Sequence, residues 1–485
     1  MPSGPMGDPV PRRSRTRCGR RGSTLPTPSA MTTHRNWTSP ARTSGPHWAD
    51  RRSGRIAGGR NVGEFSSELA AGMRALVSPY GVVSEVLPGA PVRGLAGLSL
   101  ASARVNGAPG VERPEEFGGA GRSLAGPDDA ELIAVAEAAE RYSGADFPGS
   151  GERWATVAEL DGPVLDMTAV PRCSETEYAS GHCPVVPFRA EEPIRWQGGL
   201  DMASGEAVWV PSVMARHGIR RLAPAERFWN RISTGYAVHS DPTEALLRGL
   251  CEVCERDSAA LVWLQMLPLP RLGFTRPTAT LSALLDHCAR HFVTTHFYDA
   301  TTDIGVPAVY CVQVAEYDDA CRRSVGCAVG RDLTEAAEKA LLEAVPARAL
   351  FHRANPDSHA LVMAGAQFMG RPERRHAFDF LLKQRRSRRA EDGARLPRDA
   401  GKALARVVGA LAERGMRAVA VDRTTRELAA AGLTAVCVVV PGLQPLTFHR
   451  YGQYRAHPRL YSAPVAMGHP SRPEKELNPW PQPFQ

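Results

Sequence analysis

The sequence predicts a mixed fold of helices and strands, of the α/β or α+β class. Two observations lead to this prediction. Apolar runs rich in β-branched residues, such as residues 306–314 and 434–440, have the length and composition of buried strands. Longer segments between such runs place apolar residues at helical spacing, so helices and strands mix along the chain. The chain has 485 residues, of which 43% are hydrophobic, and this is enough for one large domain or two to three ordinary ones.

The most informative segment is a helix that is expected to begin at Asp241-Pro242. Asp is a favourable N-cap residue, and Pro is tolerated at the first helical position. Glu244, Glu252 and Glu255 then fall on one broad face, because the helix turns once in about 3.6 residues. Neighbouring carboxylates repel one another unless a cation lies among them. Most charged helix faces are simply solvated, so this helix alone does not establish a site.

The same acidic pattern occurs three times. Each copy has an acidic residue followed by Ala and a second acidic residue eight positions later. The copies contain Asp129, Glu137, Glu140 and Arg141; Glu244, Glu252, Glu255 and Arg256; and Glu335 and Glu343. The first two continue as Glu-x-x-Glu-Arg, whereas the third has Pro346 and Ala347 at those positions. Such helices can gather carboxylates around hard cations and leave arginines for phosphates. Since the sequence contains no GxxxxGK[ST] motif, the pattern predicts a nucleotide–magnesium site built on helices.

The other elements follow from local pattern. Residues 65–76 are expected as an amphipathic helix, followed by a β-rich segment to residue 105. Residues 106–128 are rich in Gly and Pro, and Gly118–Ser123 is interpreted as a loop, either an ordinary turn or one whose backbone N–H groups cradle phosphate. Further strands are expected at 207–213, 306–314, 326–330, 418–422 and 434–440, further helices at 281–292, 400–412 and 424–431, and an exposed helix or loop at 372–397.

Charge is concentrated at the N-terminus. Residues 1–62 consist mainly of Arg, Pro, Ser, Thr and Gly and are expected to be disordered. They hold twelve Arg and two Asp of a chain with net charge +8, so the remaining residues sum to about −2. A nearly neutral body does not favour nucleic acid as a partner. The basic tail is interpreted either as a binder of something acidic or as an upstream start of translation, with Met31 or Met73 as later starts.

The ten cysteines show no short disulfide framework, and we find no secretory signal and no run of about 18 apolar residues. These features predict a protein of the cytoplasm, with no association with membranes. Cys251 and Cys254 have redox or zinc spacing, but they lie within the acidic helix and are interpreted as ordinary helix cysteines. Cys173 and Cys183, with His182 between them, are interpreted either as metal ligands or as ordinary loop residues. His239 is interpreted either as a base or as a structural residue.

Several features together resemble the YcaO family. They are the Glu-x-x-Glu-Arg helices, the turn Ser233-Thr234-Gly235 and the segment Val440-Pro441-Gly442-Leu443-Gln444-Pro445. The C-terminal Pro479-x-Pro481-x-Pro483 resembles the tail of the azoline-forming branch, the cyclodehydratases of thiazole/oxazole-modified peptides. The resemblance covers roughly residues 75–485. It implies a YcaO-type ATP-binding fold, with acidic helices packed on β-sheets over residues 63–470 and a Pro-rich tail at 471–485 that reaches the active site.

The resemblance also implies the cofactors, ATP and Mg²⁺, and a role for each matching residue. The residues implied are Glu137, Glu140, Glu252 and Glu255 at magnesium; Arg122, Arg141, Ser240, Glu244, Arg256 and Arg348 around the nucleotide; and Pro479, Pro481, Pro483 and Gln485 beside the reacting groups. The arginines suit phosphate because a guanidinium can hold two oxygens at once. The sequence departs from the family where Ile133 replaces Ser, Pro346 replaces Gln, Ser240 replaces Asn, Arg122 replaces Lys and Gln485 replaces a terminal Pro.

The implied activity is ATP-dependent cyclodehydration of Cys, Ser or Thr in a ribosomal precursor peptide, in an antibiotic pathway such as that of a thiopeptide. The amide-derived oxygen would be phosphorylated and leave as phosphate. We identify no leader-binding segment in this chain and therefore expect a separate partner of the ubiquitin-activating-enzyme-like type; the family also implies a homodimer. Two alternatives are another YcaO backbone chemistry, such as thioamide or amidine formation, and a non-catalytic scaffold. The Pro-rich tail argues against the first, and Pro346 in the third helix motivates the second.

Overall fold

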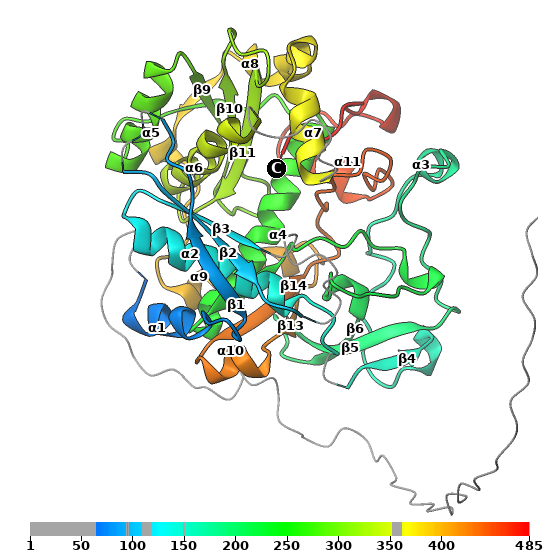
Figure 1. Cartoon of the computed structure of the whole chain (residues 1–485). Coiled ribbons are helices and arrows are strands. Elements are labelled where there is room, and N and C mark those ends of the chain that lie inside the picture. The colour runs from blue at the N-terminus through cyan, green and yellow to red at the C-terminus, as the bar shows by residue number, and fades with distance from the viewer. Residues whose placement is uncertain are drawn as a thin grey trace, which may run out of the picture. The chain divides into compact units, whose positions relative to one another are not determined.

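The computed structural model describes residues 65–93, 95, 97–108, 118–148, 151–351 and 361–484. The tail predicted at 1–62 and the terminal Gln485 lie outside these residues. The described chain forms β-sheets with helices packed against them (Figure 1). The predicted mixed class of fold is therefore confirmed.

The strands are β1 (Val83–Pro88), β2 (Ser99–Val105), β3 (Gly119–Ser123), β4 (Arg153–Ala155), β5 (Ile194–Asp201), β6 (Ala207–Pro211), β7 (Tyr236–His239), β8 (Arg271–Gly273), β9 (Thr294–Asp299), β10 (Ala308–Val314), β11 (Arg323–Val329), β12 (Ser387–Arg389), β13 (Val419–Asp422) and β14 (Thr434–Val439). The α-helices are α1 (Ser67–Ala75), α2 (Pro127–Ser143), α3 (Glu175–Ala179), α4 (Pro242–Leu264), α5 (Ala279–Arg290), α6 (Leu333–Phe351), α7 (Leu361–Gly370), α8 (Asp379–Leu382), α9 (Ala400–Ala412), α10 (Arg426–Ala430) and α11 (Arg459–Ala466).

Three sheets are present within the described residues. The first has the order β1-β2-β3, the second β11-β10-β9-β8-β12, and the third β4-β5-β13-β14-β7 with β6 paired to β5. Each acidic helix packs on a sheet: α2 on β2 and β3, α6 on β10 and β11, and α4 on β7 and β14. Because α4 also contacts β10 and β11, it joins the two larger sheets, and Figure 1 shows it between them.

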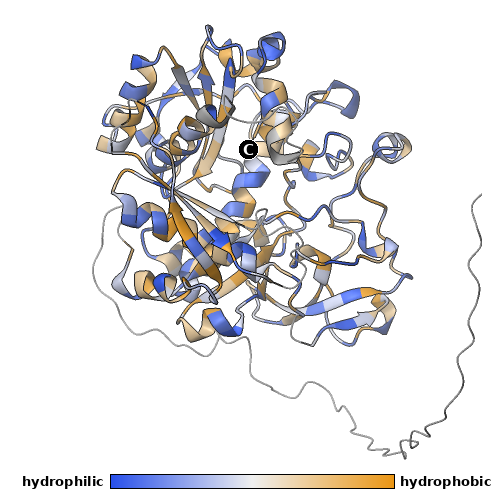
Figure 2. Cartoon of the chain, viewed as in Figure 1, coloured by the Kyte–Doolittle hydropathy of each residue, from blue (hydrophilic) through white to orange (hydrophobic). Residues whose placement is uncertain are grey.

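Helix α4 begins as the sequence predicts. The Asp241 carboxylate accepts a hydrogen bond from the Thr243 backbone N–H at 2.8 Å, and Pro242 follows it in the first turn. The C-terminal third of the helix, from Asp257 onward, is buried. Figure 2 shows hydrophilic colouring along the middle of α4, next to hydrophobic strands. The polar middle of this helix is therefore held inside the fold by apolar packing on either side of it.

A buried ion-pair network fixes α4 to the chain that follows β14. Arg459 donates from Nη2 to Asp257 Oδ2 at 2.7 Å, and the same atom lies 2.8 Å from Asp303 Oδ1. Asp257 Oδ1 also accepts from the backbone N–H of Gln444 at 2.9 Å. Gln444 belongs to the Val-Pro-Gly-Leu-Gln-Pro segment noted in the sequence, so this segment serves to position the central helix.

The prediction of a phosphate-cradling loop at Gly118–Ser123 is wrong. Residues 119–123 form β3, which pairs antiparallel with β2. The glycines allow α2 to lie directly on this strand: a Cβ atom on Gly121 would come within 1.7 Å of the Ala130 carbonyl oxygen, and one on Gly119 within 2.0 Å of that of Ala134. The small residues therefore serve close packing of a helix on a strand.

The prediction of an exposed segment at 372–397 also needs correction. The segment contains a 3₁₀ helix, η5 (Pro372–Phe378), followed by α8 and β12. Phe378 and Leu381 are fully buried, and the Phe378 ring packs 5.2 Å from that of Trp263 on α4. The many charged residues of this segment led to the prediction of exposure, although Phe378 and Leu381 fix it to the core. None of the described helices is long and apolar enough to cross a membrane.

Candidate active site

Helix α2 supplies the first pair of carboxylates. The Glu137 side chain accepts a hydrogen bond from the Ala120 backbone N–H of β3 at 2.7 Å and forms an ion pair with Arg141 one turn later. The Glu140 carboxylate accepts from the Val238 backbone N–H of β7 at 3.4 Å. Both predicted acidic residues of this helix are thus anchored by backbone groups of neighbouring strands.

Helix α4 supplies the second pair in the same manner. Glu252 accepts from the Gly235 backbone N–H at 2.9 Å, and Glu255 accepts from the Val329 backbone N–H of β11 at 3.1 Å. The Arg256 guanidinium bridges them, with 3.1 Å to Glu252 and 2.7 Å to Glu255. Gly235 has a φ of +87°, which favours glycine at this turn.

Helix α6 adds a carboxylate that the sequence analysis did not assign to the site. Glu343 interacts electrostatically with Arg122 of β3, with Arg256, and with Glu137 and Glu252. The spacing of eight residues from Glu335 was the signal that could have identified it. All three acidic helices therefore contribute to one cluster, which we call the acidic cluster: Glu137, Glu140, Glu252, Glu255 and Glu343.

Four carboxylates of the acidic cluster have a raised pKa: Glu140, Glu252, Glu255 and Glu343. Burial, reinforced by the charges of Glu252 and Glu137, raises the pKa of Glu140 to about 8. Burial together with the charges of Glu343 and Glu252 raises the pKa of Glu255 to about 8, although Arg256 opposes this shift. Burial also raises the pKa of Glu252 and of Glu343. Burial is the largest cause of each of these shifts, and a cation bound beside the buried carboxylates would offset the cost of their charge.

These residues fit a hard cation held together with an anionic ligand. Carboxylate oxygens are the donors that Mg²⁺ prefers, and Mg²⁺ commonly takes one or two carboxylates together with water and phosphate oxygens. Among the described residues, no three His, Cys, Asp or Glu side chains form a group that could hold a metal ion by themselves. Arg122 and Arg256, beside Glu343, are donors that suit phosphate oxygens.

The other residues predicted around the nucleotide lie in different settings. Glu244 pairs with Arg331 at 3.2 Å and with Arg248 at 3.8 Å. Ser240 is half-buried between β7 and α4. Arg348 pairs through Nη1 with the buried Asp318 at 3.0 Å and also donates to the Cys321 carbonyl, so this nitrogen is engaged within the protein. Helix α6 continues through Pro346, so this residue does not end the third acidic helix.

The C-terminal tail runs along α4 in the opposite direction. The Asn478 backbone N–H donates to the Leu264 carbonyl at 2.9 Å, and the Trp263 indole N–H donates to the Trp480 carbonyl at 3.1 Å. Further along, the Arg256 guanidinium lies 4.9 Å from the ring centroid of Phe484. Figure 1 marks this end of the chain beside α4. The tail therefore ends at a residue that bridges two acids of the acidic cluster.

The three prolines of the tail differ in exposure. Pro479 is exposed, Pro481 is half-buried, and Pro483 is buried. The predicted terminal residue, Gln485, lies outside the described residues. Proline fixes φ, so an extended tail of this composition loses little entropy on ordering.

The remaining candidates receive structural explanations. Cys251 and Cys254 are unpaired thiols on α4, and Cys254 is buried. Cys173 and Cys183 are also unpaired, and the His182 ring stacks 4.9 Å from that of Tyr451. His239 Nδ1 accepts from the Asp241 backbone N–H at 2.9 Å, and burial lowers the pKa of His239 to about 4. His239 thus helps to shape the turn into α4.

The fold and the site together define a class of protein. Carboxylates and guanidiniums from three helices meet in one cluster, and no Walker loop is present in the sequence. This arrangement is that of a helix-built site for a divalent cation and a phosphate-bearing ligand.

The family can now be named. A family model described as YcaO cyclodehydratase, ATP- and Mg²⁺-binding, matches residues 120–444, about two thirds of the chain. The chain belongs to the YcaO family, and the predicted cofactors, ATP and Mg²⁺, are those of the family description. An uncharacterized protein in the tfuA 3′ region of Rhizobium leguminosarum bv. trifolii is 31% identical over 195 residues, which is 38% of this chain and 43% of that relative.

Solved structures show the same fold. A heterocyclase in complex with substrate and cofactor gives a TM-score of 0.73 at 23% identity, and the match covers 86% of this chain and 57% of the heterocyclase. YcaO from Methanopyrus kandleri, bound with AMPPCP and Mg²⁺, gives 0.55 at 20% identity, with 75% and 86% covered. A chain of the E. coli microcin synthetase McbBCD complex gives 0.58 at 14% identity, with 76% and 90% covered. The chain thus spans little more than half of the heterocyclase and less than half of the curated relative.

Proposed function

We propose that the protein is an ATP-dependent cyclodehydratase that converts Cys, Ser or Thr residues of a ribosomal precursor peptide into thiazoline or oxazoline rings. The observation that carries this proposal is the meeting of the acidic cluster with the Pro-rich tail at Arg256. Membership of the YcaO cyclodehydratase family supports the class of reaction.

The bound ATP and Mg²⁺ would supply the phosphoryl group that turns an amide oxygen into a good leaving group. The residues of this chain would bind and orient. Glu137 and Glu140 from α2 and Glu252 and Glu255 from α4 would hold the cations. Fixed backbone hydrogen bonds already position these four carboxylates, which reduces the cost of binding.

Arg122 and Arg256 would face the phosphates, with Arg141 paired to Glu137 beside them. Guanidiniums placed in advance stabilise developing phosphate charge without reorganising during the reaction. In the free protein the carboxylates with raised pKa carry protons, so cation binding would displace protons from Glu140 and Glu255.

We infer that the chain works with a separate leader-binding protein. The microcin synthetase McbBCD, one chain of which has the same fold, is a multi-protein complex, and this supports the inference. A partner of the ubiquitin-activating-enzyme-like type would present the precursor, and the product would belong to an antibiotic pathway such as that of a thiopeptide. If the precursor peptide binds this chain equally well with and without a partner protein, the inference of a separate leader-binding protein is contradicted.

The experiment is mass spectrometry of the precursor peptide after incubation with this protein, its partner, ATP and Mg²⁺. Losses of whole water masses with matching phosphate release are expected. Conversion to a thioamide or amidine would replace the proposal with another YcaO chemistry. Intact peptide in the absence of ATP binding would support the scaffold alternative.

A further inference from the structure

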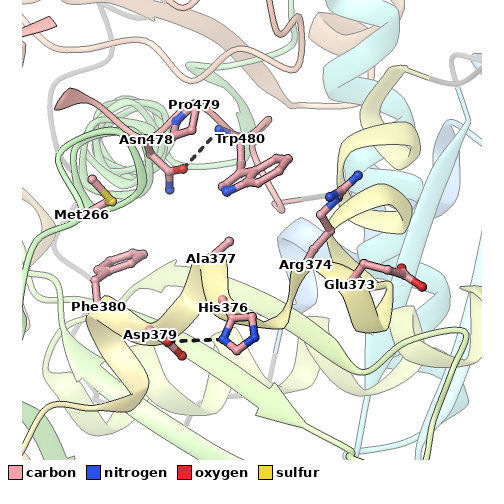
Figure 3. Close-up of a pocket in the computed structure, with 10 residues that line it drawn as sticks. All are labelled: Met266, Glu373, Arg374, His376, Ala377, Asp379, Phe380, Asn478, Pro479 and Trp480. Atoms are coloured by element: carbon pink, nitrogen blue, oxygen red, sulfur yellow. Dashed lines mark hydrogen bonds and ion pairs between the residues drawn. The ribbon is translucent and has the colours of Figure 1, made fainter. Parts of the chain in front are cut away.

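A pocket of about 320 Å³ lies between the tail and the segment η5–α8 (Figure 3). Its apolar lining includes Met266 after the end of α4, Ala377 and Phe380 from the opposite segment, and Pro479 and Trp480 from the tail. Figure 3 shows Ala377 and Phe380 pointing towards the tail across this space. The volume suits one large side chain and adjoining backbone of a ligand, at the lower end of the range for binding pockets.

Stacking holds one wall of the pocket in place. The Arg374 guanidinium lies 4.6 Å from the ring centroid of Trp480 and 4.5 Å from that of Phe368 on α7. The Trp480 carbonyl is also bound by the Trp263 indole N–H. The pocket is therefore formed in advance and does not depend on a ligand to order Trp480.

Asn478 gives the pocket a hydrogen-bond donor without a partner. This side chain is 1% exposed, and its Oδ1 accepts from the Trp480 backbone N–H at 3.2 Å. Its Nδ2 has no hydrogen-bond partner among the described residues, and Figure 3 shows it aimed from the tail into the pocket. A buried amide N–H without an acceptor is unfavourable, and a carbonyl oxygen of a ligand would satisfy it.

The charged residues of the lining do not favour an anionic ligand. Glu373 and Asp379 line the pocket, and Asp379 pairs with His376 at 3.6 Å and with Lys383 at 2.8 Å. Arg374 also lines the pocket, so the lining carries charges of both signs and does not select for an anion. An uncharged amide with an apolar side chain matches both the lining and the Asn478 donor.

The pocket and the acidic cluster are joined by the same tail. Asn478 lines the pocket, whereas Phe484, six residues later, contacts Arg256. An extended chain advances about 3.1 Å per residue, so the two places are about 19 Å apart along the tail. A peptide that lies extended beside the tail would reach the pocket about six residues from the residue at the acidic cluster.

We propose that this pocket binds an apolar side chain of the precursor peptide, about six residues from the residue that is cyclised, while Asn478 donates to a backbone carbonyl of that peptide. The inference rests on the proposed cyclodehydratase function. It adds a determinant of which residue in the peptide is chosen, because an anchor at fixed distance selects the residue that reaches the acidic cluster.

Calorimetric titration of the full chain without ATP tests the proposal. The probe is a capped peptide with Leu six residues before and six residues after a single Cys, and Gly elsewhere. Replacing both Leu by Ala should weaken binding about tenfold or more, because the apolar contact is lost. Moving both Leu to two residues from the Cys should weaken it similarly. Equal affinity for these peptides would overturn the proposal.

Variants separate the pocket from general effects. Ala377→Met fills the pocket and should reduce the affinity for the Leu peptide to that for the Ala peptide. Ala412→Met, on the exposed end of α9, is the matched control and should change nothing. Asn478→Asp keeps the Oδ1 acceptor, removes the donor, and should also weaken binding of the Leu peptide. A preference for Leu that survives in both pocket variants would overturn the proposal.

Sedimentation and product analysis complete the test. A change in the mass of the protein on Ala377→Met would show the pocket to be a contact between copies, and the peptide assignment would fail. Ring formation is measured separately by mass spectrometry. Leu-dependent binding without ring formation would support the peptide pocket and refute the proposed function. Ring formation without Leu-dependent binding would support the proposed function and refute the peptide pocket.

Discussion

The Arg256 guanidinium lies 4.9 Å from the ring centroid of Phe484 and pairs with Glu252 and Glu255 on the opposite side. One side chain thus connects the acidic cluster to the end of the described chain. Both contacts are made by the same guanidinium, so a change in the charge of the acidic cluster should alter its contact with the Phe484 ring.

Glu252→Gln should weaken Mg²⁺-dependent ATP binding. The amide oxygen can still accept from Gly235, but the charge that favours a cation is lost. We expect at least a tenfold loss of affinity, about 1.4 kcal/mol, by calorimetry with and without Mg²⁺. Glu131→Gln, on the exposed face of α2, is the control. If the Mg²⁺-dependent affinity for ATP is unchanged in Glu252→Gln, Glu252 is not a metal ligand.

Stability of the ligand-free protein should fall as pH rises from 5 to 8. Unfolded glutamate titrates near 4.5, whereas burial raises the pKa of Glu140 and Glu255 to about 8 in the folded state. The folded state therefore holds more protons over this range, and deprotonation favours unfolding. Melting temperatures with EDTA should show this slope, and Mg²⁺ with ATP should reduce it.

Glu140→Gln should reduce the same slope because it removes one of these titrating groups, and Glu131→Gln should not. An identical pH dependence in the wild-type protein and in Glu140→Gln would contradict the raised pKa of Glu140.

Phe484→Ala should lower ring formation by about tenfold or more while ATP affinity is retained. Phe484 is 2% exposed and anchors the tail on Arg256, but the ion pairs of Arg256 do not depend on it. Phe292→Ala, at a side chain that is 82% exposed, is the matched control.

Deleting residues 479–485 should abolish ring formation and leave nucleotide binding unchanged. Normal ring formation in either variant would show that the tail has no part in the reaction.

Gly121→Ala should destabilise the fold by about 2 kcal/mol or more, because its Cβ would come within 1.7 Å of the Ala130 carbonyl oxygen. Gly409→Ala makes the same change inside α9, where the added Cβ meets nothing within 4 Å. It should stabilise by about 0.5–1 kcal/mol. Urea unfolding of both variants distinguishes a packing requirement from a general effect of glycine.

Arg459→Met should destabilise the protein by about 3–5 kcal/mol, because it leaves Asp257 buried without its cation and Asp303 with Arg414 alone. Arg398→Met, at an exposed position, should stay within about 0.5 kcal/mol of the wild-type protein. A small effect of Arg459→Met, measured from the urea midpoint, would mean that α4 is held by its apolar packing alone.

The sequence was sufficient for the features with a local signal. Asp241-Pro242 marks the start of α4, and the eight-residue spacing of acids identifies three helices that pack on sheets. The runs at 306–314 and 434–440 correspond to β10 and β14. These patterns are set by capping and periodicity, which depend only on neighbours in the chain.

What the sequence did not reveal depends on contacts between distant residues. Gly118–Ser123 has the composition of a loop, but residues 119–123 pair with β2, and their glycines let α2 lie directly on the strand. Arg348 has the charge for phosphate, but the buried Asp318 lies within 3.0 Å of it. Glu343 joins the acidic cluster because β11 brings α6 towards α4. Of these three, Glu343 alone had a signal in the sequence, namely its spacing of eight residues from Glu335; the other two pairings have no such spacing.

Because the tail runs antiparallel along α4, the number of residues between its contacts with the helix is constrained. Residues 478, 480 and 484 contact residues 264, 263 and 256, so the two segments are matched at three points. Removing one residue between Trp480 and Phe484 would shift Phe484 by about 3 Å along the helix and away from Arg256. Substitutions in this stretch should accordingly be tolerated in evolution far more often than insertions or deletions.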